Sequence, residues 1–295
     1  MRINPNPLPD LISALSKTEQ EINSDLQQTA SGRSVNVPSD NPANSAMLVR
    51  NARQMAEADQ FLRSLNSITC EMQTADSTLN SVITILQRAI SLGVEGANST
   101  VNASDRAALA AEVQGIQSQL VSLGNLSYQG HFVFAGTASQ DAPYVLDSSS
   151  PSGVKYVGNS GVNQVTVGDH LTVATNLPGS QLFSASGSDV FQAIQDLVTS
   201  LQAGSNIDTA ISQLSAAYQN INSKRVFYGN VINQLNTQQT YLNSETTQLA
   251  QQQNSLGGVD LSRVLSDLVN AQTARQATLE AIGQTNQANL FNYIK

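Results

Sequence analysis

The feature that most constrains this chain is a seven-residue repeat of apolar side chains in the long segment from Asn41 to Val94. The repeat runs in two registers three residues apart, with no proline or glycine inside it, which is typical of a helix packed lengthwise against another helix. Its members are Leu65, Met72, Leu79 and Leu86 on one register and Ile68, Ala75, Val82 and Ala89 on the other. A helix of this span would be roughly 80 Å long at about 1.5 Å per residue, so we expect an elongated molecule.

Local signals mark the ends of this predicted helix. Asn41 offers a side chain that can cap the first turn, and Pro42 has the fixed φ that suits the first helical position. Gly93 and Gly96 are the expected stop. A second helix is predicted to follow, capped by Ser104 and running to about residue 126, and the short loop before it implies an antiparallel return.

A second long helix is predicted to end near Leu256 and carries its own repeat. One register holds Tyr228, Leu235, Leu242, Leu249 and Leu256, and the alternate register holds Ile232 followed by Gln239, Thr246 and Gln253. Polar layers in such a seam cost stability and can fix the register of the pairing. The alternative is that this face is only half buried, and the residues alone leave both interpretations open.

Between the helical segments, the pattern changes to one typical of strands. From Tyr144 to Leu182 apolar residues recur with a period close to two, and glycines and prolines interrupt them, which predicts three or four short strands. A module of about 50 residues is marginal alone, so we expect it to lean on the helices. The predicted fold is therefore mainly α with a small β insertion (α+β), built on an antiparallel long-helix bundle.

Both ends of the chain carry narrow apolar stripes. An isolated helix of about 20 residues is marginal in water, so these ends are expected to pair with each other and with further copies. The candidate assembly residues are Leu8, Leu11, Leu15, Ile22 and Leu26 at the start, and Leu261, Leu265, Leu268, Leu279, Ile282, Leu290, Phe291 and Ile294 at the end. The candidate core of the long helices is Leu65, Ile68, Met72, Leu79, Val82, Leu86, Leu235, Leu242 and Leu249.

These patterns predict a nested division into three domains. Residues 1–40 and 257–295 form a terminal coiled-coil domain, residues 41–137 and 188–256 form the long-helix bundle, and residues 138–187 form the small β domain.

Composition excludes several classes of function. The net charge is −8 and lysines and arginines do not cluster, so nucleic acid is not an expected partner. No run of 18 apolar residues predicts a membrane span, and the first ten residues lack the apolar core of a cleavable secretory signal. Cys70 is the only cysteine, which rules out an intramolecular disulfide, and we interpret it as a small side chain on the long helix.

No motif in the chain predicts catalysis or a cofactor. His131 and His170 lack cysteines or carboxylates at metal-site spacing, and Gly158-Asn159-Ser160-Gly161 does not match a nucleophile elbow. There is no P-loop and no dinucleotide-binding glycine motif. We therefore expect a protein that is not an enzyme and that needs no cofactor or metal.

One stretch resembles a known family. The segment 30–43, Ala-Ser-Gly-Arg-Ser-Val-Asn-Val-Pro-Ser-Asp-Asn-Pro-Ala, resembles the signature near the start of bacterial flagellin-type axial proteins. Pro38 and Pro42 resemble the version at the junction between hook and filament, since flagellin itself usually lacks them. Residues 130–136 and the ending Leu290-Phe291-Asn292-Tyr293 are also similar, and the resemblance covers some 240 residues. The β insertion is similar only in being a β module, since this part varies within the family. Cys70 is a departure, because proteins of this family tend to lack cysteine.

The resemblance implies a structural subunit of the bacterial flagellum at the hook–filament junction. It implies export through the flagellar type III apparatus without a cleavable signal, assembly of lateral copies into a ring, and contacts with hook-associated protein 1 and flagellin. It further implies that a flagellar export chaperone holds the C-terminal region, that the terminal helices line an inner tube and that the β module faces outward. The alternatives are a flagellin-like filament subunit, and a secreted coiled-coil effector or glycan-binding protein.

Overall fold

The computed structural model describes residues 8–169 and 171–293, with side chains up to Thr285 in the last helix. His170, Ile294 and the side chains of Leu290 and Phe291 lie outside this description. By its internal contacts the chain divides into two compact units, Met1–Glu57 with Ser244–Lys295 and Ala58–Asn243. Both boundaries fall inside long helices. The three-domain division predicted from the sequence stays a prediction.

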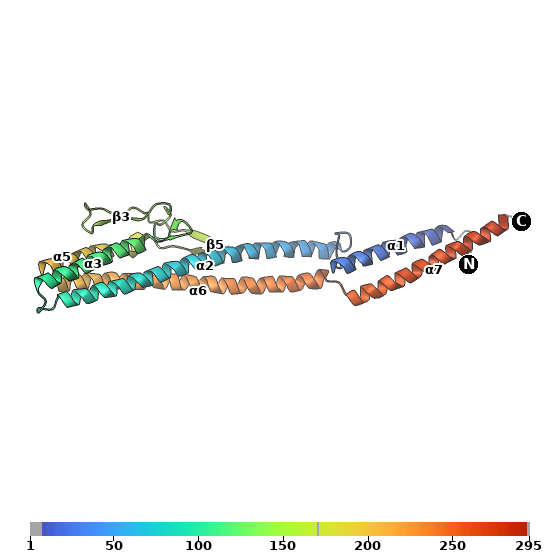
Figure 1. Ribbon diagram of the computed structural model, residues 1–295. Helices are drawn as coiled ribbons and strands as arrows, with labels where there is room; N and C mark the ends of the chain where they lie inside the picture. The colour runs from blue at the N-terminus through green and yellow to red at the C-terminus, as the bar shows by residue number, and fades with distance from the viewer. Residues whose placement is uncertain (1–7, 170, 294–295) are drawn as a thin grey trace. The chain divides into compact units, whose positions relative to one another are not determined.

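Helices account for most of the chain, as the heptad patterns predict. The two long helices are 55 and 51 residues in length. In chain order the helices are α1 (Leu8–Ser31), α2 (Pro42–Gly96), α3 (Ala103–Gly124), the single turn α4 (Gly179–Leu182), α5 (Val190–Ala203), α6 (Ile207–Gly257) and α7 (Leu261–Tyr293), labelled in Figure 1 where there is room. The fold class predicted from the sequence, mainly α with a small β insertion, is confirmed.

Both ends of α2 follow their local signals, but the predicted start of α3 does not. Asn41 Oδ1 accepts the N–H of Asn44 at 3.0 Å, which caps the helix before Pro42. The helix continues through Gly93, where a Cβ atom would lie only 2.9 Å from Ile211 Cγ1, and it ends at Gly96. The prediction of Ser104 as the cap of α3 is wrong, since Asn102 Oδ1 accepts the N–H of Asp105 at 2.9 Å two residues earlier.

The strands form four separate antiparallel hairpins. They are β1 (Ser127–Tyr128) with β2 (His131–Phe132), β3 (Tyr144–Leu146) with β4 (Val154–Tyr156), β5 (Gln164–Gly168) with β6 (Leu171–Ala174), and β7 (Ser184–Ala185) with β8 (Ser188–Asp189). A bulge shifts the register between Thr166 and Gly168. Hairpins of two strands are marginal in water, so their stability has to come from the helices that they pack on.

Hydrogen bonds tie these hairpins to the helices of the second unit. Asn125, just after α3, exchanges two bonds with the backbone of Tyr144: its Nδ2 donates to the carbonyl oxygen at 2.7 Å, and its Oδ1 accepts the N–H at 2.8 Å. Tyr228 on α6 accepts the N–H of Leu177 through its hydroxyl at 3.3 Å. The β insertion is therefore held by polar groups of α3 and α6 as well as by apolar packing.

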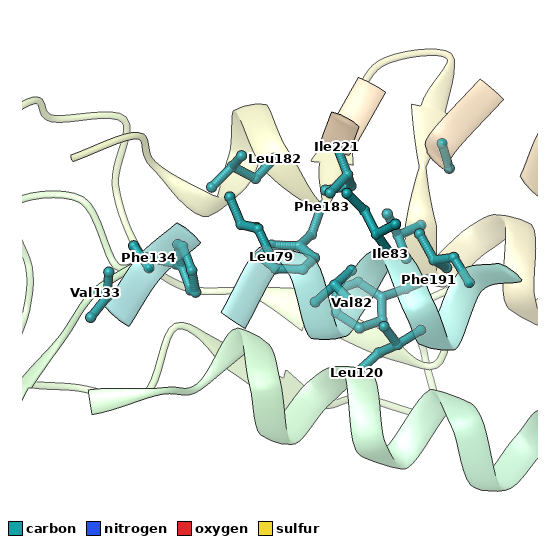
Figure 2. Packing of buried hydrophobic residues seen from close by; sticks show 14 of the residues in the cluster. Leu79, Val82, Ile83, Leu120, Val133, Phe134, Leu182, Phe183, Phe191 and Ile221 are labelled. Carbon is teal, nitrogen blue, oxygen red and sulfur yellow. The ribbon is translucent and has the colours of Figure 1, made fainter. Parts of the chain in front are cut away.

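One apolar core runs through the second unit, where α2, α3, α5 and α6 lie side by side (Figure 1). Figure 2 shows Leu79 and Val82 of α2 among Leu120 of α3, Phe191 of α5 and Ile221 of α6. The rings of Phe134 and Phe183 meet edge to face at 5.4 Å, which is a favourable geometry for aromatic pairs. Phe183 also stacks on Phe191 of α5, with the ring centroids 6.1 Å apart, so this aromatic cluster joins the β insertion to the helices.

Candidate assembly surface

The two terminal helices, α1 and α7, pack as an antiparallel pair within the first unit (Figure 1). The seam between them is thin. Ile22 is the buried side chain of α1, and Val264 and Ala271 are the buried apolar side chains of α7 among the described residues. Because helices of this length need a substantial buried face, so thin a seam leaves apolar surface available for other contacts.

Two connectors join the terminal helices to the long ones, and they bond to each other. Gly32 ends α1 with φ at +68°, a conformation that glycine adopts without strain. Arg33 then pairs with Gly258 as an isolated antiparallel bridge, and the N–H of Ser34 donates to the carbonyl oxygen of Gly257 at 2.8 Å. This backbone pairing fixes the first connector against the second, at the end of α6.

The rest of the first connector is a turn held by one carboxylate. Asp40 Oδ2 accepts the N–H groups of Asn36 and Val37, both at 2.9 Å. These two bonds hold the pKa of the Asp40 carboxyl below its ordinary value, because they favour the charged form. Pro38 lies inside this turn, where its missing N–H costs nothing. The proline-containing signature segment is thus a structured turn leading into α2.

A groove lies beside this turn. It has a volume of about 530 Å³ and is bounded by the first connector, the start of α2 and the end of α6. Apolar side chains line part of it, including Leu48 and the exposed Val49.

The α1–α7 pair presents an apolar stripe on one of its sides. Ile12 and Leu26 of α1 are 54% and 48% exposed, and Leu265 and Val269 of α7 are 48% and 60% exposed. Leu261, Leu265 and Val269 follow one another at intervals of four residues, so they lie on one side of α7. In an antiparallel pair, Ile12 and Leu26 lie on this same side. Large apolar side chains that share an exposed stripe mark a surface that associates with something else.

The opposite side of the pair is acidic. Glu21 and Asp25 of α1 and Asp267 of α7 line a groove of about 480 Å³. Burial raises the pKa of the Asp25 carboxyl, and the charges of Asp267 and Glu21 raise it further, while the Arg263 guanidinium opposes the shift. The two sides of one helix pair therefore differ in chemistry, with leucines on one and carboxylates on the other.

The described part of the chain was compared with two further kinds of site, a metal centre and a membrane span. No group of three or more histidines, cysteines, aspartates or glutamates there could hold a metal ion. None of the described helices is long and apolar enough to cross a membrane.

Comparison with known proteins shows which proteins the chain resembles. Residues 10–139 match the family model of the bacterial flagellin N-terminal helical region. Flagellar hook-associated protein 3 of Escherichia coli K12 is 25% identical over 91% of this chain and 92% of its own length. The chain is a homologue of flagellar hook-associated protein 3. It has a flagellin-like structural role in the flagellum and so acts outside the cell.

Two solved structures resemble this hook-associated protein 3 homologue in fold. One, from Vibrio parahaemolyticus and described as a flagellar hook-associated protein, has a TM-score of 0.69 at 21% identity, covering 74% of this chain and 100% of its own. The flagellar junction protein of Legionella pneumophila has a TM-score of 0.63 at 15% identity, covering 72% of this chain and 100% of its own.

The assembly residues that the sequence nominates fall into three groups in this homologue. Leu26, Leu261, Leu265 and Leu279 are exposed, Leu8, Leu11, Leu15, Leu268 and Ile282 are half-buried, and Ile22 is buried. Leu290, Phe291 and Ile294 fall where the structure gives no side chains. The predicted stripe therefore combines residues of the α1–α7 seam with residues of the exposed side.

The nominated residues of the long helices are all buried. Leu65, Met72, Leu79, Val82, Leu86 and Leu235 are at most 1% exposed, and Ile68, Leu242 and Leu249 are at most 9% exposed. The polar layer at Gln239 is half-buried, and its Nε2 donates to Asn66 Oδ1 on α2 at 2.9 Å. This polar layer is thus paired across the seam, although it stays near solvent.

Sequence reasoning missed several residues of the assembly surface. Val264 and Ala271, which form the α7 side of the seam, are seven residues apart, and that spacing could have identified them. The grouping of Asp25 with Asp267 depends on how α1 and α7 face each other. No signal within either helix alone could have predicted it.

Proposed function

We propose that copies of this chain assemble side by side into a ring at the junction between hook and filament, between hook-associated protein 1 and the first flagellin subunits. The observation that carries the proposal is the apolar stripe on the α1–α7 pair, whose side chains are 48–60% exposed. A single copy offers no cover for this stripe among its described residues. A neighbouring copy in the ring can cover the stripe with apolar side chains from another part of its surface.

The same proposal assigns each part of the chain a position in the flagellum. The terminal helices line the inner tube, where neighbouring copies cover their apolar stripe, and the β hairpins of residues 138–187 face outward. The subunit leaves the cell through the flagellar type III apparatus without cleavage, and an export chaperone holds its C-terminal region beforehand. The similarity to hook-associated proteins over more than nine-tenths of their length supports this assignment.

Truncation tests the proposal directly. Removal of residues 1–35 or 262–295 is expected to leave a soluble helical monomer, because the core of residues 58–243 does not depend on α1 or α7. Neither fragment should join a filament when it is the only copy in the cell. Filament growth supported by either fragment would contradict the proposal. Purified full-length protein that grows long filaments unaided would instead favour a flagellin-like filament subunit.

Single substitutions separate assembly from folding. Leu265→Asp is expected to block incorporation into flagella while shifting the melting temperature of the monomer little, since Leu265 is 48% exposed. Leu15→Asp and Leu268→Asp should also block incorporation, with larger melting losses because both side chains are half-buried. Ser266→Asp is the control for added charge, because Ser266 is exposed and lies two residues from the buried Val264, off the stripe. If the Leu265→Asp variant were incorporated normally, the apolar stripe would not be part of the interface between copies.

A further inference from the structure

The acidic side of the α1–α7 pair has room for side chains from another molecule. Its groove of about 480 Å³ is lined by the carboxylates of Glu21, Asp25 and Asp267. Between them lie Ser24, Ala271 and Ala274, whose small side chains leave space next to the charges. A groove that combines negative charge with small residues fits a long cationic side chain, which can lay its methylene groups along the floor and its charge against the carboxylates.

The carboxylates in the groove repel one another, and a cation bound there would reduce this repulsion. Asp25 is partly desolvated and lies close enough to Asp267 and Glu21 for their charges to raise its pKa, and only Arg263 counteracts them. An additional positive charge would offset the repulsion among the three carboxylates.

A complementary surface lies on the first turns of α2. Asn44 and Asn51 face α6, bonding to the Leu256 carbonyl oxygen and the Gln252 side chain, both at 3.0 Å. Val49, Arg50 and Arg53 lie on other sides of the same turns, and Val49 is 69% exposed. Within the described residues neither arginine makes an ion pair. This α2 face therefore offers two uncompensated cations next to an exposed apolar side chain.

We infer that the acidic groove between α1 and α7 receives Arg50 and Arg53 of a neighbouring copy of this chain. The inference rests on the proposed lateral assembly and names the contact within it. A ring or tube requires two different patches that complement each other, because a self-complementary patch closes into a dimer. The acidic groove and the basic face of α2 are two such patches on one chain. Arginine is the side chain best suited to bind several carboxylates through its planar set of donors.

Site-directed crosslinking in assembled flagella tests this contact. In a Cys70→Ser background, Ser24→Cys is placed in the groove and Val49→Cys beside the two arginines, and isolated flagella are treated with a short thiol crosslinker. We expect a ladder of crosslinked dimers and higher species. As a matched control, Ser24→Cys is replaced by Thr273→Cys, which lies two residues from the buried Ala271 and so on the outer face of α7. An equal ladder from the control pair, or none from the test pair, overturns the inference.

Charge reversal provides a second test. Asp25→Arg with Asp267→Arg, and separately Arg50→Glu with Arg53→Glu, are each expected to lower the amount of subunit in flagella about tenfold, the size of one close charge pair. Combining all four changes should restore it to within about threefold. Circular dichroism of each purified variant checks that it folds. Failure of the fourfold variant to recover, or an equal loss with the exposed Glu280→Arg, contradicts the inference.

These outcomes separate the contact from the assembly. If the unaltered chain is found at the hook–filament junction but the Ser24–Val49 pair does not crosslink, the groove contact fails and the proposed function stands. If the unaltered chain is absent from the junction, the proposed function itself fails.

Discussion

The two compact units of this chain carry the same kind of seven-residue repeat but bury it to very different extents. In the second unit, Leu79 and Leu86 of α2 have no exposed surface, because α3, α5 and α6 surround them. In the first unit, Leu26 and Leu265 each keep nearly half of their surface exposed, because α1 and α7 have mainly each other. The repeat therefore specifies that a helix needs a partner, and the number of helices around it decides whether the same chain supplies that partner.

The difference divides the molecule by role. The second unit has the thick core and the aromatic cluster that a stable monomer needs. The first unit has a thin seam with an apolar side and an acidic side, which suits contacts that form only on assembly. A subunit that is exported and then assembled has a reason to keep its association surfaces apart from its main core.

The strongest test of this difference between the two units is to shorten one leucine to alanine in each of them. Leu79→Ala should lower the free energy of unfolding by about 2–5 kcal/mol, since it leaves a cavity in a closed core. Leu265→Ala should change it by less than about 0.5 kcal/mol, because the side chain is already half in water. Urea unfolding of the purified monomer measures both. Equal losses would mean that the terminal stripe is as well covered in the monomer as the long-helix core.

A second test concerns the polar end of the α2–α6 seam, in the first unit. Asn51 is 1% exposed and its Nδ2 donates to Gln252 Oε1 at 3.0 Å. Gln252→Ala should cost about 1–3 kcal/mol, because Gln252 is exposed but its removal leaves the buried Asn51 amide without its partner. The double change to leucine at both positions should cost much less and is the matched control. A double variant as unstable as the single one would show that the pair serves more than mutual hydrogen bonding.

The surface of the second unit should be less sensitive. Arg225 bonds Asp76 through two nitrogens, at 2.8 and 2.9 Å, with both side chains about 30% exposed. Arg225→Met should cost only about 1 kcal/mol, since partly exposed ion pairs contribute little. The loss should shrink further when the same urea titration is repeated at 1 M salt, because salt screens exposed charges. A loss comparable to that of Leu79→Ala would place this pair among the main determinants of stability.

The smallest expected effect is a dependence of stability on pH through Glu71 of α2. Burial raises the pKa of the Glu71 carboxyl, which the charge of His131 partly opposes. A raised folded-state pKa means that stability is greatest when the carboxyl is protonated and falls as the pH rises from the ordinary glutamate pKa through the folded pKa. Glu71→Gln should therefore flatten the stability profile in that window and slightly stabilise the protein at neutral pH. Parallel profiles for the two proteins would contradict the assignment.

Much of the fold could be predicted from local pattern. Helix α2 starts at Pro42 as its capping signal indicates, and α5 follows Asp189, whose Oδ1 accepts the N–H of Gln192 at 2.9 Å. Alternation and glycine placement predicted the short strands between Tyr144 and Ala174. Where the prediction was wrong, as for the cap of α3, two capping residues stood within three positions, and the choice between Asn102 and Ser104 depends on which side chain reaches a free N–H.

The sequence by itself determined the helices, their apolar registers and the resemblance of the connector to flagellin-type proteins, because periodicity and capping are local properties. Only the tertiary structure decided that Asp25 meets Asp267 across a groove, that Asn51 pairs with Gln252, and that the leucines of α7 lie on the side of the pair away from its carboxylates. These facts depend on how one helix is rotated against another. That rotation is set by all the contacts of both helices together, and neither repeat specifies it alone.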